Sequence, residues 1–403
     1  MTWTKIVNGI AADHFTRAIR EDLHRPGMLY AATERSVMVS YDDGANWTSL
    51  QKNLPPVPVS DMMLRDDDLA ISTHGRAFWV LENLTALRWA PEVEKAAGSA
   101  PYLYKPVPVY RLNGQTQPTF TYRLPADSLV VKFEFYDAAG KLVGTAASND
   151  TAKAPVDPRF EGMGFAPPAP PKPANKKGVN RFSYTMKHDD AKTFRGMITW
   201  AGRGNGPSMA PGMYRVRMTA GNSAPVSYDF RVLPDPRSEA TGADLKEQVR
   251  FALQVRDKIT AANQGVIESR NIKSALTDRT PKMASVAGFA PLAKSFADSL
   301  LAVEDSLYQT KNQSGQDPLN FPIRLNDQLG GLMGFVMSGE RRPAKQSYDV
   351  WNVLAPKTDG ELARLERVIT TQLPKINALL KAAGQAEIVR SKTEGPAPQP
   401  ITP

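Results

Sequence analysis

The residues best suited to acid–base, metal or anion chemistry fall in three short polar segments near the start of the chain. The segments contain Asp13 and His14, then Glu34, then His74 and Arg76. A histidine and a carboxylate can act as a general base or a metal ligand, and an arginine can hold an anion. These five residues are the candidate catalytic set, provided that the fold brings the three segments together.

Several common catalytic and cofactor motifs are missing from the sequence. There is no cysteine, which excludes disulfides, thiolate metal ligands and a cysteine nucleophile. None of the four histidines has an H-x-x-x-H neighbour, and neither a G-x-S-x-G elbow nor a phosphate-binding P-loop occurs. Zinc hydrolases, serine hydrolases and nucleotide-binding enzymes of the usual kinds are therefore disfavoured. We interpret the glycine-rich stretch 202–206 as a plain loop.

The elements that would position the candidate residues are short strands separated by turns. Apolar runs predict strands over 16–20, 28–33, 37–40, 47–50, 61–65, 68–72 and 77–81. Four strands in about 35 residues make one propeller blade. Residues 1–90 are therefore predicted to form terminal β-propeller blades, and Trp3–Lys5 the last strand of a preceding blade.

A distinctive turn separates the third and fourth of these strands. Residues 40–47 read S-Y-D-D-G-A-N-W and match the Asp-box pattern S-x-D-x-G-x-[TN]-W. Asp42 can accept hydrogen bonds from the turn, Gly44 can adopt a positive φ and Trp47 can fill the space between strands. We interpret the motif as a structural turn remote from chemistry, in preference to a sialidase active site.

Four segments together resemble the end of a sortilin-like propeller of BNR repeats, a group often labelled glycosyl hydrolase in bacteria. They are residues 12–17, 27–35, the Asp-box and 72–81. Members of the group are usually longer, with more blades before this point, so the resemblance implies that this chain is a truncated product, an internal start or a fragment. The family suggests a secreted or periplasmic protein. The N-terminus has no signal peptide, which predicts a cytoplasmic location for the chain as written.

Propeller geometry predicts that the candidate residues share one rim. Asp13 and His14 precede an innermost strand, whereas Glu34, His74 and Arg76 fall in loops between second and third strands. Such loops open on the same face of a propeller, and the Asp-box lies on the opposite side. The alternative interpretation is that these polar side chains only hold neighbouring loops together.

Two classes of function remain open at the level of sequence. The first is a hydrolase acting on a glycoside through Asp13 and Glu34, or on a small lactone or ester with Ca²⁺ bound by the same carboxylates. Asp66–Asp68 is interpreted as a solvated turn, with Ca²⁺ binding as the alternative. The second class is a non-catalytic module that binds a peptide or glycan in adhesion. A protein partner at the exposed propeller edge is a further expectation.

The rest of the chain predicts two more domains and a tail. After a link at 91–103, residues 104–235 read as an immunoglobulin-like β-sandwich with a Pro-rich exposed loop at 167–173 and an expected strand at 194–200. A 3.6-residue apolar period begins at a capping box, Thr241–Asp244, and predicts a helical bundle over 240–383 whose last stripe ends before Pro374. Residues 384–403 are predicted to be disordered.

Composition limits the partners. The 50 Lys and Arg are scattered among 41 Asp and Glu, giving a net charge of +9 without a basic, aromatic stripe of the nucleic-acid-binding kind. No apolar run reaches the roughly 18 residues of a membrane span. We therefore expect neither a nucleic-acid partner nor a membrane-spanning segment.

Overall fold

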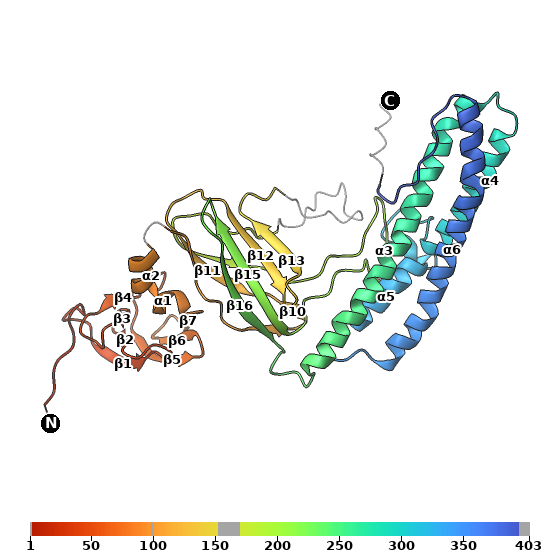
Figure 1. Ribbon diagram of the computed structural model, residues 1–403. Coiled ribbons are helices and arrows are strands. Elements are labelled where there is room, and N and C mark those ends of the chain that lie inside the picture. Colours follow the sequence, from red (N-terminus) through yellow and green to blue (C-terminus); the bar gives the residue numbers. More distant parts are fainter. Residues whose placement is uncertain (1, 98–99, 152–169, 395–403) are drawn as a thin grey trace.

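The computed structural model describes residues 2–97, 100–151 and 170–394. Figure 1 shows three parts in chain order: two small sheets at the N-terminal side, two further sheets in the middle and a set of long helices at the C-terminal side. The protein is thus a mixed β and α chain with several sheets and a C-terminal helical region.

The N-terminal part consists of two antiparallel sheets. The first, in the order β1-β2-β3-β4, comprises β1 (Thr16–Glu21), β2 (Leu29–Thr33), β3 (Val37–Ser40) and β4 (Thr48–Ser49). The second, in the order β5-β6-β7, comprises β5 (Val59–Arg65), β6 (Asp68–Thr73) and β7 (Phe78–Leu81). The seven strands predicted from the apolar runs are confirmed to within about two residues at each end.

The two sheets pack face to face over a shared apolar core. Met28, Tyr30 and Val39 from the first sheet lie in one cluster with Val59 and Met62 from the second. β1 lies beside β5, and an Arg20–Asp61 ion pair of 2.7 Å joins the two strands. The first strand of each sheet therefore meets the other sheet, and the assignment of these sheets to propeller blades stays a prediction.

The predicted strand at Trp3–Lys5 is wrong. These residues are exposed and unpaired, and the chain that follows them covers the free face of the first sheet instead. The indole Nε1 of Trp47 donates to the Ile6 carbonyl at 3.0 Å, and the Trp47 amide donates to Asn8 at 2.9 Å. Backbone groups near residues 6–8 thus hold the Trp47 side of the sheet without forming a strand.

The opposite face of the second sheet is open in the described residues. Met63 is 66% exposed, Phe78 is 81% exposed and Val80 is 58% exposed, and β7 lies at the edge of its sheet. An apolar face beside a free strand edge is suited to covering by another polypeptide. The partner expected at this edge stays a prediction.

The predicted link at 91–103 contains helix over its first part. Two short helices, α1 (Thr85–Arg88) and α2 (Ala90–Ala97), follow the second sheet, and β8 (Tyr102–Leu103) comes after them. Val93 is buried, and Trp89 lies under the Arg25 guanidinium at 5.6 Å. The helices form because this Ala-rich stretch can bury one side against the sheets, a gain that a free linker would lack.

The middle part contains two sheets around an aromatic core. The larger, in the order β10-β9-β16-β15-β12-β13, comprises β9 (Val109–Leu112), β10 (Gln115–Thr116), β12 (Val131–Asp137), β13 (Leu142–Ala147), β15 (Gly212–Ala220) and β16 (Val226–Leu233). The smaller, in the order β14-β11-β8, adds β11 (Thr119–Leu124) and β14 (Gly178–Ser183). Phe120, Phe133, Phe135 and Phe182 are buried in the core that both sheets share. The predicted hairpin before and after residue 140 is confirmed by the antiparallel pairing of β12 and β13.

The expected strand at 194–200 is wrong. The segment is irregular, and Phe194 and Met197 are buried in the core of the helical region. The Arg270 guanidinium lies 4.7 Å from the centre of the Phe194 ring. The apolar residues of 194–200 therefore pack on helices rather than in a sheet. Of the Pro-rich loop, 170–173 has no regular structure, and 167–169 lies outside the described residues.

The C-terminal part is built from four long helices: α3 (Gly242–Arg279), α4 (Phe289–Leu307), α5 (Leu325–Val336) and α6 (Lys345–Ala382). The capping box is confirmed, because the Thr241 hydroxyl accepts from the Asp244 amide while the Asp244 carboxylate accepts from the Thr241 amide. The apolar stripe predicted before Pro374 lies in α6, and the helix runs past this proline to Ala382, within the predicted range 240–383. α6 continues because Ile376 and Leu380 extend its buried stripe. No helix in the described ranges is long and apolar enough to cross a membrane.

The predicted disorder of 384–403 is wrong for residues 385–394, which pack on the helices. Ile388 is buried and exchanges two hydrogen bonds with the Asn377 side chain. Arg390 forms ion pairs of 2.6 Å with Glu268 and with Glu366. These polar anchors balance the cost of ordering a segment with few apolar residues. Residues 395–403 lie outside the described part.

Candidate functional site

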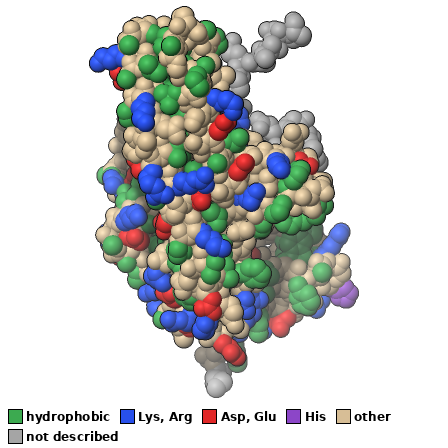
Figure 2. All heavy atoms as spheres, turned by 90° about the vertical axis from the view of Figure 1, so that its right-hand side faces the viewer, with side chains coloured by type: hydrophobic (Ala, Val, Ile, Leu, Met, Phe, Trp, Pro, Cys, Tyr) green, Lys and Arg blue, Asp and Glu red, His purple; other side chains and the backbone are tan. Residues whose placement is uncertain are grey.

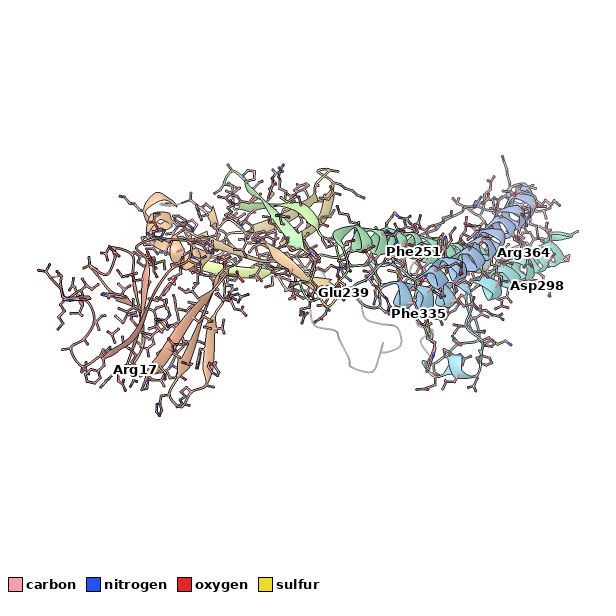
Figure 3. The ribbon with its side chains drawn as sticks, turned by 90° about the horizontal axis from the view of Figure 1, so that it is seen from below. Arg17, Glu239, Phe251, Asp298, Phe335 and Arg364 are labelled. Atoms are coloured by element: carbon pink, nitrogen blue, oxygen red, sulfur yellow. The ribbon has the colours of Figure 1, made fainter. Side chains whose placement is uncertain are left out.

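The candidate residues lie at one end of the two N-terminal sheets. β1 begins where β2 ends, since Thr16 pairs with Thr33, and β5 begins where β6 ends, since Val59 pairs with Thr73. We call the loops at this end the rim: residues 13–17, 34–35, 57–58 and 73–76. Figure 3 shows Arg17 at the end of the strands away from α1 and α2.

Backbone hydrogen bonds join the rim loops into one surface. The Glu34 amide donates to Phe15 at 2.9 Å, the Val57 amide donates to Arg35 at 3.1 Å, and the His74 amide donates to Pro58 at 2.9 Å. The structure therefore brings the three predicted segments to a common end. The sequence interpretation that they share an end is confirmed, whereas their catalytic role stays a prediction.

Glu34 is held by an arginine. Nε and Nη2 of Arg17 both donate to Oε2 of Glu34, at 2.8 and 2.5 Å. Arg17 lies at an irregularity of β1, between Thr16, which pairs with Thr33, and Ala18, which pairs with Ala32, so it stands next to the end of β2 that leads into Glu34. This charge-assisted contact neutralises the carboxylate that a hydrolase would need as an acid, base or metal ligand. Sequence reasoning missed Arg17, because the contact depends on the register of β1 against β2.

Asp13 lies between a cation and an imidazole. Its Oδ2 is 3.3 Å from Nη2 of Arg35, and its Oδ1 is 4.0 Å from Nε2 of His14. The other ring nitrogen of His14, Nδ1, is buried and has no hydrogen-bond partner. The Asp13 side chain itself is 63% exposed. The group is thus a surface cluster with one buried, uncommitted imidazole nitrogen.

His74 and Arg76 are exposed at the third rim loop. The loop is shaped by Thr73, whose hydroxyl accepts from the Arg76 amide at 3.2 Å, and by Gly75, whose φ is +92°. The Arg76 carbonyl accepts from the Trp79 indole at 2.9 Å. Backbone contacts therefore fix the loop while the side chains of His74 and Arg76 face solvent.

Arginines lie beside the two rim carboxylates that are the predicted metal ligands. Across the residues that the structure describes, no group of three or more His, Cys, Asp or Glu side chains could hold one. Asp13 and Glu34 each lie beside a guanidinium, which competes with a cation for the same oxygens, whereas Ca²⁺ usually takes six to eight oxygen ligands. Calcium at Asp13 and Glu34 stays a prediction.

The Asp-box turn lies at the opposite end of the strands, as predicted. Asp42 accepts from the Asn46 amide and from the Ser40 hydroxyl, both at 2.8 Å, and Gly44 has a φ of +85°. Trp47 is 4% exposed. Hydrogen bonds from Asn46 and Ser40 hold the pKa of Asp42 below its usual range. All these contacts are internal to the turn, which supports the structural interpretation.

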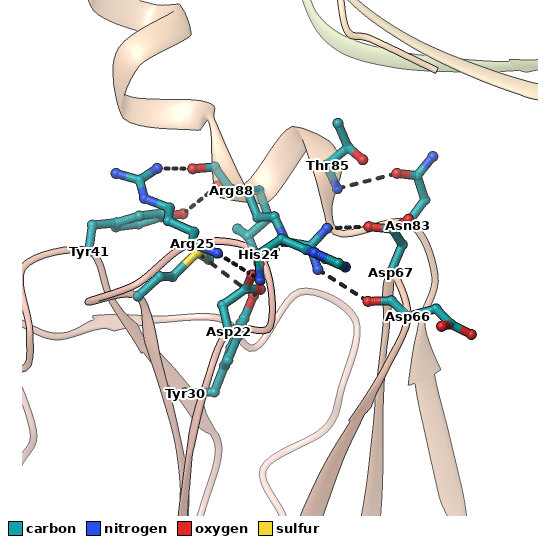
Figure 4. Close-up of polar contacts among 12 residues, drawn as sticks. Asp22, His24, Arg25, Tyr30, Tyr41, Asp66, Asp67, Asn83, Thr85 and Arg88 are labelled. Carbon is teal, nitrogen blue, oxygen red and sulfur yellow. Dashed lines mark hydrogen bonds and ion pairs between the residues drawn. The ribbon is translucent and has the colours of Figure 1, made fainter. Parts of the chain in front are cut away.

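A buried ion cluster, unpredicted by the sequence, lies at this same end (Figure 4). Nε of Arg88 in α1 donates to Oδ1 of Asp22 at 2.7 Å, and its Nη1 pairs with Asp67. The Tyr30 hydroxyl donates to the other Asp22 oxygen at 2.9 Å. The Arg88 and Asp22 side chains are 4% and 0% exposed. The cluster joins the end of β1, the β5–β6 turn and helix α1, and we call it the Arg88 cluster.

The predicted turn at Asp66–Asp68 is present between β5 and β6 and Asp66 is exposed, but Asp67 and Asp68 have protein partners in place of solvent. Asp67 pairs with Arg88, and the Asp68 carboxylate accepts from the Asn83 amide at 2.9 Å. Burial raises the pKa of Asp22, but hydrogen bonds from the His24 amide, Arg88 and Tyr30 outweigh it and hold that pKa below its usual value. Burial and the Asp22 charge raise the pKa of Tyr30. Asp22 is therefore ionised and Tyr30 neutral near pH 7, and the cluster serves the fold.

Comparison with known proteins does not place the chain in a family. It matches no protein-family model and no curated protein. Among solved structures, it is similar to the extracellular domain described as that of a hybrid two component system, BT3049 from B. thetaiotaomicron, with 9% identity and a TM-score of 0.17 over 57% of this chain. The C-terminal domain of wzt gives 12% identity and a TM-score of 0.15, with 35% of this chain and 80% of that one covered. The chain spans 27% of the BT3049 domain, and scores this low do not define a shared fold.

Proposed function

We propose that this chain is a non-catalytic binding module whose rim takes a ligand bearing carboxylates, either an acidic glycan or an acidic peptide. The observation that carries the proposal is the pairing of both rim carboxylates with arginines: Glu34 with Arg17 and Asp13 with Arg35. A general acid or base must be free to exchange a proton with a substrate, and these pairings oppose that role.

The remaining rim charges favour an anionic ligand. The rim has one more arginine than carboxylate, and Arg76 is the arginine without a carboxylate within ion-pair distance in the described ranges. Arg76 and His74 are two positions apart on a loop whose backbone is held by a hydrogen bond to Thr73, so binding there does not require the backbone to be ordered. A planar guanidinium next to an imidazole suits a carboxylate oxygen pair.

The test is calorimetric titration of the whole chain with oligogalacturonate and with hexaglutamate, each against a neutral counterpart. We expect one acidic ligand to bind, and the double change His74→Ala with Arg76→Ser to weaken it about tenfold, the equivalent of about 1.4 kcal/mol. Arg65→Ser is the matched control, because Arg65 is equally exposed but ends β5 at the opposite end. Equal binding of the neutral ligands, or an equal loss in the control, would contradict the proposal.

A hydrolase acting on a small lactone, ester or glycoside is the second candidate, favoured by one observation. His14 keeps a buried Nδ1 without a partner and has Asp13 next to its other nitrogen. If this pair acts as a general base, turnover of lactone, aryl ester or aryl glycoside should disappear in His14→Ala and Asp13→Ala. Assays with Ca²⁺ and with a chelator would show whether metal takes part. Such turnover would replace the binding proposal.

A further inference from the structure

An apolar groove runs between α5 and α6, far from the rim. Its volume is about 620 Å³, and it is lined by Leu332, Phe335 and Val336 from α5 and by Val350 and Leu354 from α6. The loop that carries Ala201 and the segment that carries Ile323 complete its walls. Leu332, Val336 and Leu354 are buried and form the floor. The groove is therefore a shaped depression on a packed core.

The apolar surface extends beyond the groove onto the outside of both helices. Phe335 is 74% exposed, Val350 is 44% exposed and Val353 is 51% exposed. Figure 3 labels Phe335 on the helical region, and Figure 2 shows apolar side chains interspersed with Lys and Arg on the side formed by the helices. Exposed apolar residues grouped beside a groove mark an interaction surface more often than isolated ones do. The apolar surface therefore continues past the groove onto Val353.

The charged group at the groove is a cation. Arg341 lines it and donates to the Ser338 hydroxyl at 3.0 Å, and among the described residues no carboxylate lies within ion-pair distance of its guanidinium. Arg324, next to the lining residue Ile323, is exposed as well. A second copy of this chain would bring the same arginines together and carries a net charge of +9. Charge therefore favours an acidic partner over self-association.

We propose that this groove binds an amphipathic helix of a partner protein, with apolar side chains spaced i, i+4 and i+7 in the groove and Asp or Glu beside Arg341. α5 has 12 residues and is about 18 Å long. A partner helix of three to four turns matches that length. This proposal is independent of the rim, so either can fail without the other.

The test uses a display library of 14-residue helical peptides, selected against the whole chain and counter-selected against Phe335→Glu. We expect the enriched peptides to have helical apolar spacing and an excess of Asp and Glu. Their affinity should fall at least about tenfold in Phe335→Glu, as for an aromatic contact at the centre of an interface. Val389→Glu is the control, because Val389 is 81% exposed outside the groove. The exposure of Phe335 means that its substitution should leave the fold intact.

Reversing the charge of Arg341 provides a second test of the same proposal. Arg341→Glu should weaken the enriched acidic peptides and strengthen versions in which Lys replaces Glu. Enrichment without helical spacing or acidic residues would overturn the proposal. So would dodecanoate binding without peptide binding, which would indicate a small amphiphile. Self-association of the wild-type chain that Phe335→Glu abolishes would overturn it in favour of a second copy.

Discussion

Removing Arg88 should destabilise the N-terminal sheets far more than removing any exposed arginine there. In Arg88→Ala, Asp22 loses its buried ion partner and Asp67 loses its own, while α1 loses the group that joins it to both sheets. Breaking a buried pair by deleting one partner typically costs about 3–5 kcal/mol. Asp22 keeps hydrogen bonds from two backbone amides and from Tyr30, so we expect the lower end, about 3 kcal/mol.

The assay is urea unfolding followed by tryptophan fluorescence, which Trp47, Trp79 and Trp89 report for this part of the chain. Arg65→Ala is the matched control: its partner Asp66 is 3.6 Å away and both side chains are more than four-fifths exposed, so the cost should stay below about 1 kcal/mol. A wild-type-like midpoint in Arg88→Ala, or an equal loss in the control, would refute the reasoning.

The same cluster predicts a pH dependence. The pKa of Asp22 is lower in the folded than in the unfolded chain, so its contribution to stability is present above the unfolded value of about 3.9 and is lost as the pH falls through the folded pKa. The stability difference between wild type and Arg88→Ala should therefore shrink below about pH 4. A difference that is constant from pH 7 to pH 3 would contradict the assignment.

Three further predictions concern glycine packing, a buried ion pair and a buried histidine. Gly330→Ala should destabilise the chain by about 1–3 kcal/mol in thermal unfolding, because the new Cβ would lie 2.2 Å from a facing carbonyl oxygen. Gly334→Ala is the control: a Cβ there would have nothing within 4 Å, so the change should stabilise the helix by about 1 kcal/mol. Glu340→Ala should lower the unfolding midpoint because it leaves the fully buried Arg111, 3.4 Å away, without its ion-pair partner. Changing both residues to Met should restore most of the lost stability. No recovery in the double variant would argue against a buried pair. Burial lowers the pKa of His188, so the free energy of unfolding should fall as the pH drops below about 6.5. His188→Gln should flatten that part of the curve of stability against pH. An unchanged curve in the variant would refute the assignment.

Local sequence patterns were sufficient to predict the N-terminal strands, the Asp-box turn and the capping box. Each depends on residues a few positions apart: Asp42 bonds Asn46, and Thr241 bonds Asp244. The common end of the rim loops also follows from strand order alone. These features are determined by chain direction and short-range hydrogen bonds, which the sequence displays directly.

Long-range contacts account for what the sequence did not show. Arg88 meets Asp22 across 66 positions, and no spacing rule links them. Residues 194–200 have a strand-like composition, but Phe194 is buried against helices. The predicted disorder is wrong for residues 385–394 because Arg390 pairs with Glu268, which is 122 positions away. The pairing of Glu34 with Arg17, which changes the functional interpretation, likewise needed the register of β1 against β2.

Hydrogen exchange of the whole chain, with and without the acidic ligand that binds best, tests the proposed function most directly. The account predicts slower exchange at residues 13–16, 34–36 and 73–77, with no change at the Asp-box turn, 42–46. Protection at 42–46, or protection confined to the helical region, would contradict a binding rim at this end of the sheets.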